Sequence, residues 1–457
     1  MGKIVKVGSG QGFYGDTIEP AVYMAEHSDV QYICFDTLAE LTLAILQKDR
    51  QKDPTKGYPK DITNTMRKLL PFVKEKGIKL ITNAGGINPE GAKNEVLRVA
   101  KELGITGIKV GVVTGDDIYD RIDEFQENGI DLKSNDSNED LSRVREKILF
   151  ASVYLGAQPI AEALNQGADI VITGRTTDTA QFLGPLIYEF GWEEQDWDKL
   201  ASGILVGHLL ECSGQGSGGN FSGDWYNVEN LQSIGYPIAE VNEDGSFIVT
   251  KTVGSGGRVS IDTIKEQFLY EIHDPSTYIT PDVIADFTTT EFEEIGENRV
   301  LVKNTTGRPA PPTLKALMGY KNGFLGQGMI GYSWPQALSK ARAANEIIRS
   351  QIETLGIKVL DIHTEYLGYN ALHGPLAQEI DEDLINEIFL KITICTEERE
   401  EATKLAKLFP PLTVNGPPYV GMISGLSPSR ELLGLWSTLI PRETIESNIN
   451  IEVFEVI

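Results

Sequence analysis

Residues 169–178 read DIVITGRTTD, and this stretch decides the fold class. Its apolar part, Ile170–Thr173, is continuous rather than alternating, which is typical of a strand covered by helices on both faces. Similar runs occur at Ile4–Gly8, Val30–Asp36, Ile78–Asn83 and Ile108–Thr114. Strands of this kind belong to parallel sheets, so we expect an α/β domain with a mainly parallel sheet flanked by helices.

Helical patterns fall between these strands, as a parallel sheet requires. They cover Thr17–Glu26, Thr37–Asp49, Ile62–Lys76, Pro89–Leu103 and Ile160–Gln166. A further helix is predicted at Trp197–Cys212, directly before a glycine-rich run at 213–219. The polar, turn-rich segment 131–142 is interpreted as a surface loop.

The pattern changes near residue 300. A short strand at Arg299–Lys303 is followed by GRPAPP at 307–312, where adjacent prolines exclude regular structure and indicate a hinge. The segments beyond it follow a βαββα order: Thr313–Tyr320, Pro335–Leu355, Val359–Leu367, Glu387–Ile394 and Glu397–Phe409. We predict an α/β domain over 1–300 and an α+β domain with an antiparallel sheet over 301–457.

Composition limits the classes of partner. The 457 residues include 41 Lys and Arg against 66 Asp and Glu, a formal charge of −25. Such a surface repels phosphate backbones and anionic lipid, so we expect neither nucleic acid nor membrane as a partner. The three cysteines, Cys34, Cys212 and Cys395, are too far apart for a disulfide framework or a zinc ribbon. Because no signal-peptide pattern or long apolar run is seen, we expect a cytoplasmic protein.

Polar groups follow each predicted parallel strand, at the edge where α/β sheets bind ligands. The candidates are Gly10, Gly12 and Gly15 after the first strand, Asp36 after the second, Asn83, Gly85 and Gly86 after the third, Asp116 after the fourth, and Arg175 and Asp178 after the fifth. Helix capping favours several of these residue types anyway, which explains any one of them. Five strand ends together favour a ligand site.

The first loop has two interpretations. Gly10–Gly15 matches GxGxxG, and Asp36 lies where a dinucleotide fold places its ribose-binding acid. Phe13 and Tyr14 are bulky neighbours for a pyrophosphate, however. The less specific interpretation is an anion cradle made of backbone N–H groups at a helix N-terminus, shared with Gly85–Gly86. Arg175 is the expected anion anchor; the alternative is a structural ion pair with Asp178.

Acid–base candidates lie in two places. His208 and Glu211 share one face of the predicted helix and suit an acid–base pair. Asp116 is either a helix cap, a general base or, with Asp36, an oxygen ligand of Mg²⁺. Histidine spacing does not indicate zinc, and the sequence requires no cofactor.

Two cations lie in another glycine-rich segment, 250–258, which does not match a phosphate-binding Walker loop. They are Lys251 and Arg258, and either would complete an anion pocket.

Nine ordered segments resemble the acyclic terpene utilisation (AtuA) family. They are Gly8–Asp16, Phe35–Glu40, Thr82–Pro89, Gly115–Asp117, Ala168–Arg175, Gly207–Cys212, Gly235–Glu240, Asp282–Phe287 and Gly307–Thr313. The resemblance implies a catabolic role close to acyl-CoA intermediates, and a small ferredoxin-like domain after the long N-terminal region. It supplies neither a reaction nor catalytic residues.

Our hypothesis is an enzyme that hydrates, dehydrates or isomerises a small carboxylate or its CoA thioester, without a redox cofactor. Two alternatives stay open: a non-catalytic binding or assembly subunit that works with a partner, and a dinucleotide-dependent oxidoreductase. We also expect a homo-oligomer.

Overall fold

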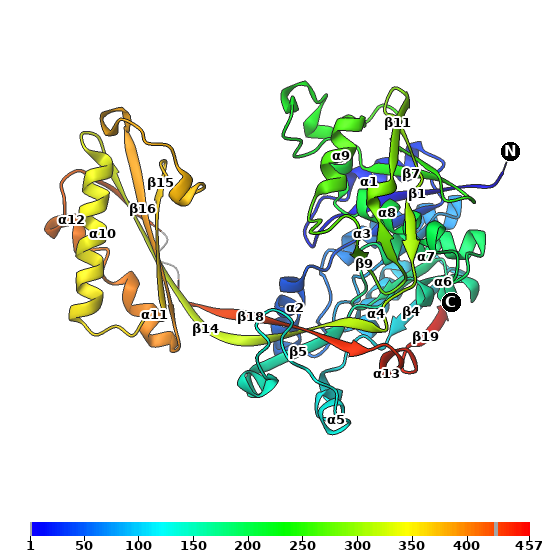
Figure 1. Cartoon of the computed structure of the whole chain (residues 1–457), viewed down its shortest axis with the longest axis horizontal. Helices are drawn as coiled ribbons and strands as arrows, with labels where there is room; N and C mark the ends of the chain where they lie inside the picture. The colour runs from blue at the N-terminus through cyan, green and yellow to red at the C-terminus, as the bar shows by residue number, and fades with distance from the viewer. Residues whose placement is uncertain (1, 425–427) are drawn as a thin grey trace. The chain divides into compact units, whose positions relative to one another are not determined.

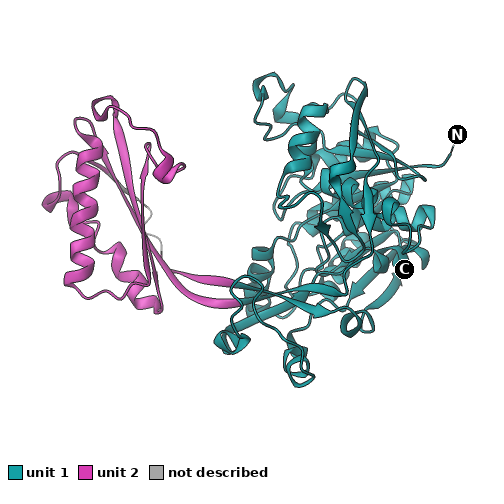
Figure 2. Cartoon of the chain, in the orientation of Figure 1, with its two compact units in different colours: residues 1–319, 435–457 teal, residues 320–434 magenta. Residues whose placement is uncertain are grey.

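The computed structural model describes residues 2–424 and 428–457, and it divides the chain into two compact units (Figure 2). Unit 1 runs to Gly319 and resumes at Leu435, and unit 2 comprises Tyr320–Gly434. The second unit therefore starts later than residue 301, and the chain returns to the first. The reason is strand pairing, since β12 (Arg299–Lys303) and β19 (Asn450–Glu455) both belong to the large sheet of unit 1.

Five parallel strands form the middle of that ten-stranded sheet. In spatial order they are β1 (Ile4–Gln11), β2 (Tyr32–Phe35), β3 (Lys79–Thr82), β6 (Ile170–Thr173) and β4 (Lys109–Thr114). Figure 1 labels β1 and β4 of this group. All five were predicted, and the α/β class is confirmed. The sequence pattern did not show that antiparallel strands extend both sides of this group. These are β7 (Pro237–Asn242), β8 (Phe247–Lys251), β12 and β11 (Glu291–Gly296) beside β1, and β19 beside β4.

Helices cover both faces of the parallel strands. A core of α1 (Glu19–His27), α3 (Ile62–Lys76) and α4 (Pro89–Glu102) packs on one face, where Ile170 and Ile172 lie. The helices on the other face are α6 (Gln158–Asn165), α7 (Ala180–Phe190) and α8 (Trp197–Leu210). This burial on both sides explains the continuous apolar runs.

Several strands were not predicted, and one of them joins distant parts of unit 1. β5 (Ile148–Val153) pairs with β14 (Thr313–Ser333), whose first residues belong to unit 1. Its backbone continuation places Tyr154 N–H 2.9 Å from the carbonyl oxygen of Lys315. A partner about 160 residues away leaves no local pattern, because β-strand formation depends on the neighbouring strand.

Unit 2 has its own core and a βαββαβ order. Its elements are the later part of β14, α10 (Ala337–Thr354), β15 (Asp361–Leu367), β16 (Glu387–Thr396), α11 (Arg399–Ala406) and β17 (Val420–Ser424). The sheet order β15-β16-β14-β17 is antiparallel throughout, which is the split βαβ arrangement of ferredoxin-like units. Within residues 2–424 and 428–457, no helix is long and apolar enough to cross a membrane.

Candidate functional site

The loop from β6 to α7 holds the most buried cation described in the chain. The side chain of Arg175 is 2% exposed, and its guanidinium carbon lies 4.2 Å from the centre of the Tyr154 ring. Its Nη1 donates to the carbonyl oxygen of Leu38 and lies 3.0 Å from Oδ1 of Asp178. The predicted structural pair of Arg175 and Asp178 therefore exists.

Asp116 ties this loop to the neighbouring strand β4. Its Oδ2 accepts a 2.7 Å hydrogen bond from the backbone N–H of Arg175. A Cβ on Gly174 would lie only 2.3 Å from the Asp116 carboxylate oxygens, so glycine is required there. Burial raises the pKa of Asp116 to about 7. Asp116 thus positions the Arg175 backbone and does not cap a helix.

Carboxylates surround the Arg175 guanidinium. Asp36 is buried and accepts a 2.6 Å hydrogen bond from the amide of Asn83. Burial, with the nearby Asp178, raises the pKa of Asp36 well above its usual value despite Arg175. Glu40 accepts a 2.7 Å hydrogen bond from the Tyr154 hydroxyl. Burial opposes its ionisation, but this bond and Arg175 together lower the pKa of Glu40.

Asp178 carries the compensating charge of the cluster. Its side chain is 38% exposed and forms the ion pair with Arg175. Desolvation raises the pKa of Asp178, and Arg175 opposes this shift. The 3.0 Å contact with the guanidinium assigns the compensating charge to Asp178, and the lowered pKa of Glu40 makes Glu40 the second ionised acid. The raised pKa of Asp36 favours its protonated form.

His208 and Glu211 form a neutral pair at the end of α8. Nδ1 of His208 lies 3.1 Å from Oε1 of Glu211, and Nε2 lies 3.2 Å from the carbonyl oxygen of Phe268. Because a carbonyl only accepts, Nε2 carries the proton. Burial lowers the pKa of His208 to about 4 and, with Asp178 nearby, raises the pKa of Glu211 well above its usual value. Glu211 is therefore the donor to Nδ1.

Several buried polar atoms around the β6–α7 loop and the end of α8 have no hydrogen-bond partner among the described residues. They are Nε of Arg175, Oγ1 of Thr176 and Thr179, Nε2 of Gln181 and Oε2 of Glu211. Each of these side chains is less than 9% exposed. A buried polar atom without a hydrogen bond is costly, so a concentration of them marks a place where a ligand or water binds.

Gln181 connects this group to the ends of the central strands. Its Oε1 accepts a 3.0 Å hydrogen bond from the backbone N–H of Asn83, and its Nε2 is one of the unpartnered atoms. Asn83 in turn accepts from the N–H and hydroxyl of Thr37 at 2.8 and 2.9 Å. The side chains gathered here therefore come from four of the five strand ends named in the sequence analysis, those of β2, β3, β4 and β6, and from the end of α8.

The glycines of the first loop do not form the predicted anion cradle. β1 continues to Gln11, so Gly10 lies within a strand, where a Cβ would meet the Phe35 ring at 2.4 Å. The N–H groups of Gly12 and Gly15 donate to Oδ2 of Asp16 at 3.0 Å and Oδ2 of Asp61 at 3.1 Å. The chain's own carboxylates take the place that a phosphate would need.

The N–H groups of the third loop are likewise bonded within the protein and do not form an anion cradle. The N–H of Gly85 donates to Thr173 O at 3.0 Å, and that of Gly86 donates to Asn83 O at 3.1 Å. A Cβ on Gly85 would lie 2.4 Å from the Thr173 carbonyl oxygen, so this glycine serves close packing of β3 and β6.

The other two predicted cations lie away from Arg175. Nζ of Lys251 donates to the carbonyl oxygen of Ser255 at 2.6 Å. Arg258 pairs with Asp224 at 2.5 Å and lies over the Phe221 ring. Neither contributes to the charge around Arg175.

Among the described residues, no three His, Cys, Asp or Glu side chains gather as a metal ion would require. Asp36 and Asp116, the predicted Mg²⁺ ligands, each accept a hydrogen bond from the protein instead.

Sequence reasoning missed Tyr154, Glu40 and Gln181. Tyr154 and Glu40 meet Arg175 from segments about 20 and 135 residues away, so no spacing reveals them. The run Thr176–Thr179, three hydroxyls and an acid directly after Arg175, is the one signal that pointed to this position.

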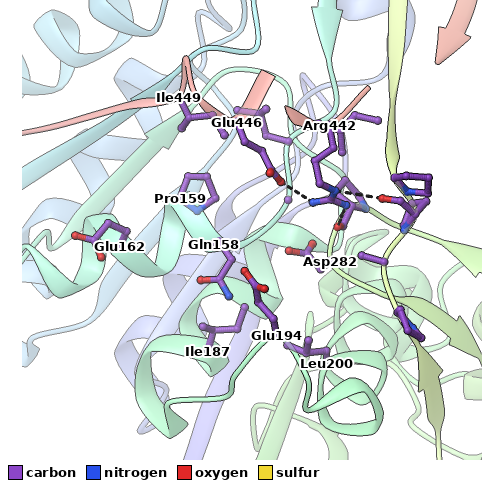
Figure 3. Close-up of a pocket in the computed structure, with 18 of the residues that line it drawn as sticks. Gln158, Pro159, Glu162, Ile187, Glu194, Leu200, Asp282, Arg442, Glu446 and Ile449 are labelled. Carbon is purple, nitrogen blue, oxygen red and sulfur yellow. Dashed lines mark hydrogen bonds and ion pairs between the residues drawn. The ribbon is translucent and has the colours of Figure 1, made fainter. Parts of the chain in front are cut away.

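A separate cavity of about 820 Å³ lies in unit 1 (Figure 3). Gln158, Glu194 and Asp282 gather in its middle, and Arg442 lies at its edge. Arg442 is already engaged by Glu446 at 2.6 Å and by the carbonyl oxygens of Pro281 and Pro311. Since the remaining charged groups are acids, this cavity does not suit a small anion, and none of the site residues above lines it.

Fold and site together define an α/β protein with a buried arginine–carboxylate cluster and a neutral His–Glu pair at the strand ends. The chain belongs to the acyclic terpene utilisation family of AtuA proteins, whose model matches residues 5–451. Membership associates it with terpene catabolism. Searches of curated proteins and of solved structures returned no match.

Proposed function

We propose that this protein is an acid–base enzyme of terpene catabolism that acts on a small carboxylate or its CoA thioester. The reaction class is hydration, dehydration or isomerisation, which moves protons and water but no hydride. The observation that carries the proposal is the neutral His208–Glu211 pair, because Oε2 of Glu211 is buried and has no hydrogen-bond partner in the part of the chain that the structure describes.

Glu211 is the proposed proton carrier. Its Oε1 holds the proton that it donates to Nδ1 of His208. When Oε2 takes a proton from the substrate, Oε1 passes its own proton to Nδ1, and when Oε2 returns a proton to the substrate, the proton on Nδ1 comes back to Oε1. His208 fixes the orientation of the carboxyl group through the 3.1 Å contact. A carboxylic acid kept protonated by burial is the form that such a step needs at neutral pH.

Arg175 and Gln181 are the proposed groups for the substrate oxygen. Negative charge develops on this oxygen when a proton leaves the adjacent carbon, and preorganised N–H donors stabilise it. Nε of Arg175 and Nε2 of Gln181 are both buried, and neither has a hydrogen-bond partner within residues 2–424 and 428–457. Glu211 also interacts electrostatically with this group, because the positive charge of Arg175 opposes the rise in the pKa of Glu211.

The test is deuterium exchange. We would incubate the protein in D₂O with branched unsaturated and hydroxy acids and their CoA thioesters, and follow deuterium uptake and addition or loss of water by NMR and mass spectrometry. Glu211→Gln keeps the shape of the side chain and a donor to Nδ1, but it cannot release a proton. We expect the rate to fall at least about 100-fold.

Glu127→Gln, a change at an exposed position, is the matched control and leaves the rate unchanged. Exchange that persists at the original rate in both Glu211→Gln and His208→Ala would show that this pair is not the proton carrier.

A further inference from the structure

We infer that the reacting end of the ligand is an uncharged carbonyl group, as in a thioester, and not a free carboxylate. The inference rests on the proposed function and narrows its substrate class. It follows from the charges already present around Arg175 and from the kind of hydrogen-bond donor left over.

The guanidinium charge is already balanced. Asp178 lies 3.0 Å from Nη1. The guanidinium also lies against the ring of Tyr154, whose hydroxyl donates a hydrogen bond to Glu40. Nζ of Lys315 lies 3.7 Å from Oε1 of Glu40 and over the Tyr154 ring, so two cations already match these two carboxylates. The raised pKa of Asp36 favours its uncharged form. A bound carboxylate would be a third anion beside two cations, of which only Arg175 is buried, where charges interact more strongly than in water.

The remaining donors suit a carbonyl oxygen. Oε1 of Gln181 is fixed as an acceptor by the N–H of Asn83, so its amide NH₂ is the free end. The hydroxyls of Thr176 and Thr179 are neutral and also have no hydrogen-bond partner among the residues that the structure describes. Neutral donors compensate a carbonyl dipole fully, but they do not balance a whole charge that is moved out of water.

The side chains on the exposed side of the cluster are mostly negatively charged. Asp178 and Glu40 are its partly exposed members, each 38% exposed, and Glu271 beside them is exposed as well. These three acids outnumber the one described cation beside them, Lys315, so a free carboxylate would be repelled on its way to Arg175, whereas an uncharged acyl group would not.

The experiment compares two small ligands with the same branched unsaturated carbon skeleton: the free acid and its uncharged N-acetylcysteamine thioester. Binding to the full chain is measured by calorimetry at pH 7.5. We expect the thioester to bind at least about tenfold more tightly than the acid.

Two variants test the cause. Asp178→Asn and Glu40→Gln each remove one negative charge beside Arg175, and we expect each to strengthen binding of the acid by about tenfold or more while thioester affinity stays within about threefold. Glu127→Gln should change neither. If Asp178→Asn fails to fold by circular dichroism, Glu40→Gln carries the test.

Equal or tighter binding of the acid by the unaltered protein overturns the inference, as does the absence of binding by either ligand. Acid affinity that stays the same in both folded variants also overturns it. These outcomes are independent of deuterium exchange: exchange on a free acid would keep the proposed enzyme and reject the thioester, whereas thioester binding without exchange would keep the ligand class and reject the enzyme.

Discussion

At the residue scale, the site depends on how buried acids share protons. Asp116 shows this most simply, because it is 3% exposed and has one clear partner, the backbone N–H of Arg175. Burial favours the neutral form of an acid, and for Asp116 this effect exceeds the stabilisation from its hydrogen bonds. The acid that positions Arg175 is therefore also sensitive to pH.

Asp116→Asn is predicted to remove a pH-dependent part of the stability. The folded-state pKa of about 7 lies above the usual 3.8, so the folded state holds the proton more tightly than the unfolded state. The stabilisation is complete below about pH 4 and is lost as the pH rises through 7. The free energy of unfolding of the unaltered protein should fall relative to that of Asp116→Asn by at most about 4 kcal/mol over this range.

Urea unfolding at a series of pH values measures this difference. Asp120→Asn, at an exposed position four residues away, should follow the unaltered protein. Parallel pH profiles for Asp116→Asn and the unaltered protein would contradict the prediction.

At the element scale, the position of α7 depends on close packing against α8. A Cβ on Gly207 would lie 2.6 Å from Cα of Thr179, and one on Gly203 would lie 2.5 Å from the Leu183 side chain. These glycines let α8 approach the start of α7 closely enough to place Glu211 near Arg175. They were not among the predicted site residues, because sequence spacing on one helix does not show which helix it meets.

Gly207→Ala is predicted to push the start of α7 away from α8. Because the obstacle is backbone, we expect a loss of about 1–3 kcal/mol in unfolding free energy and a lower exchange rate. Chemical denaturation and the D₂O assay measure the two effects. Gly421→Ala is the control, since its Cβ would have its nearest contact at 3.7 Å; an equal loss in both variants would argue against the packing explanation.

At the scale of the whole molecule, unit 2 is an insertion into unit 1. Its core residues, among them Ile330, Ile348 and Leu390, lie within 320–434, and the core on the sheet of unit 1 uses none of them. The two ends of the insertion lie together, since a Cβ on Gly434 would be 2.2 Å from the Tyr320 ring.

Residues 320–434 are therefore predicted to fold when expressed alone, and unit 1 should fold when a short Gly–Ser linker replaces them. Separate cores and adjacent ends are the features that make a domain excisable. Dispersed NMR spectra of unit 2 and a cooperative thermal transition of the linked unit 1 are the expected results. An unfolded unit 1 would mean that the insertion stabilises it through contacts beyond its own core.

The sequence by itself determined the parallel strands, the helices between them and the edge at which their polar ends gather. Those features follow from local patterns, because a strand buried on both faces must be continuously apolar and loops must be polar. It also pointed to Arg175 with Asp178 and to His208 with Glu211, pairs close in the chain. The tertiary structure alone decided that Tyr154, Glu40 and Gln181 complete the site, that Asp16 and Asp61 occupy the first glycine loop, and which acids keep their protons. Burial, and contacts between distant segments, set hydrogen-bond partners and pKa values, and neither is written in the spacing of residues along the chain.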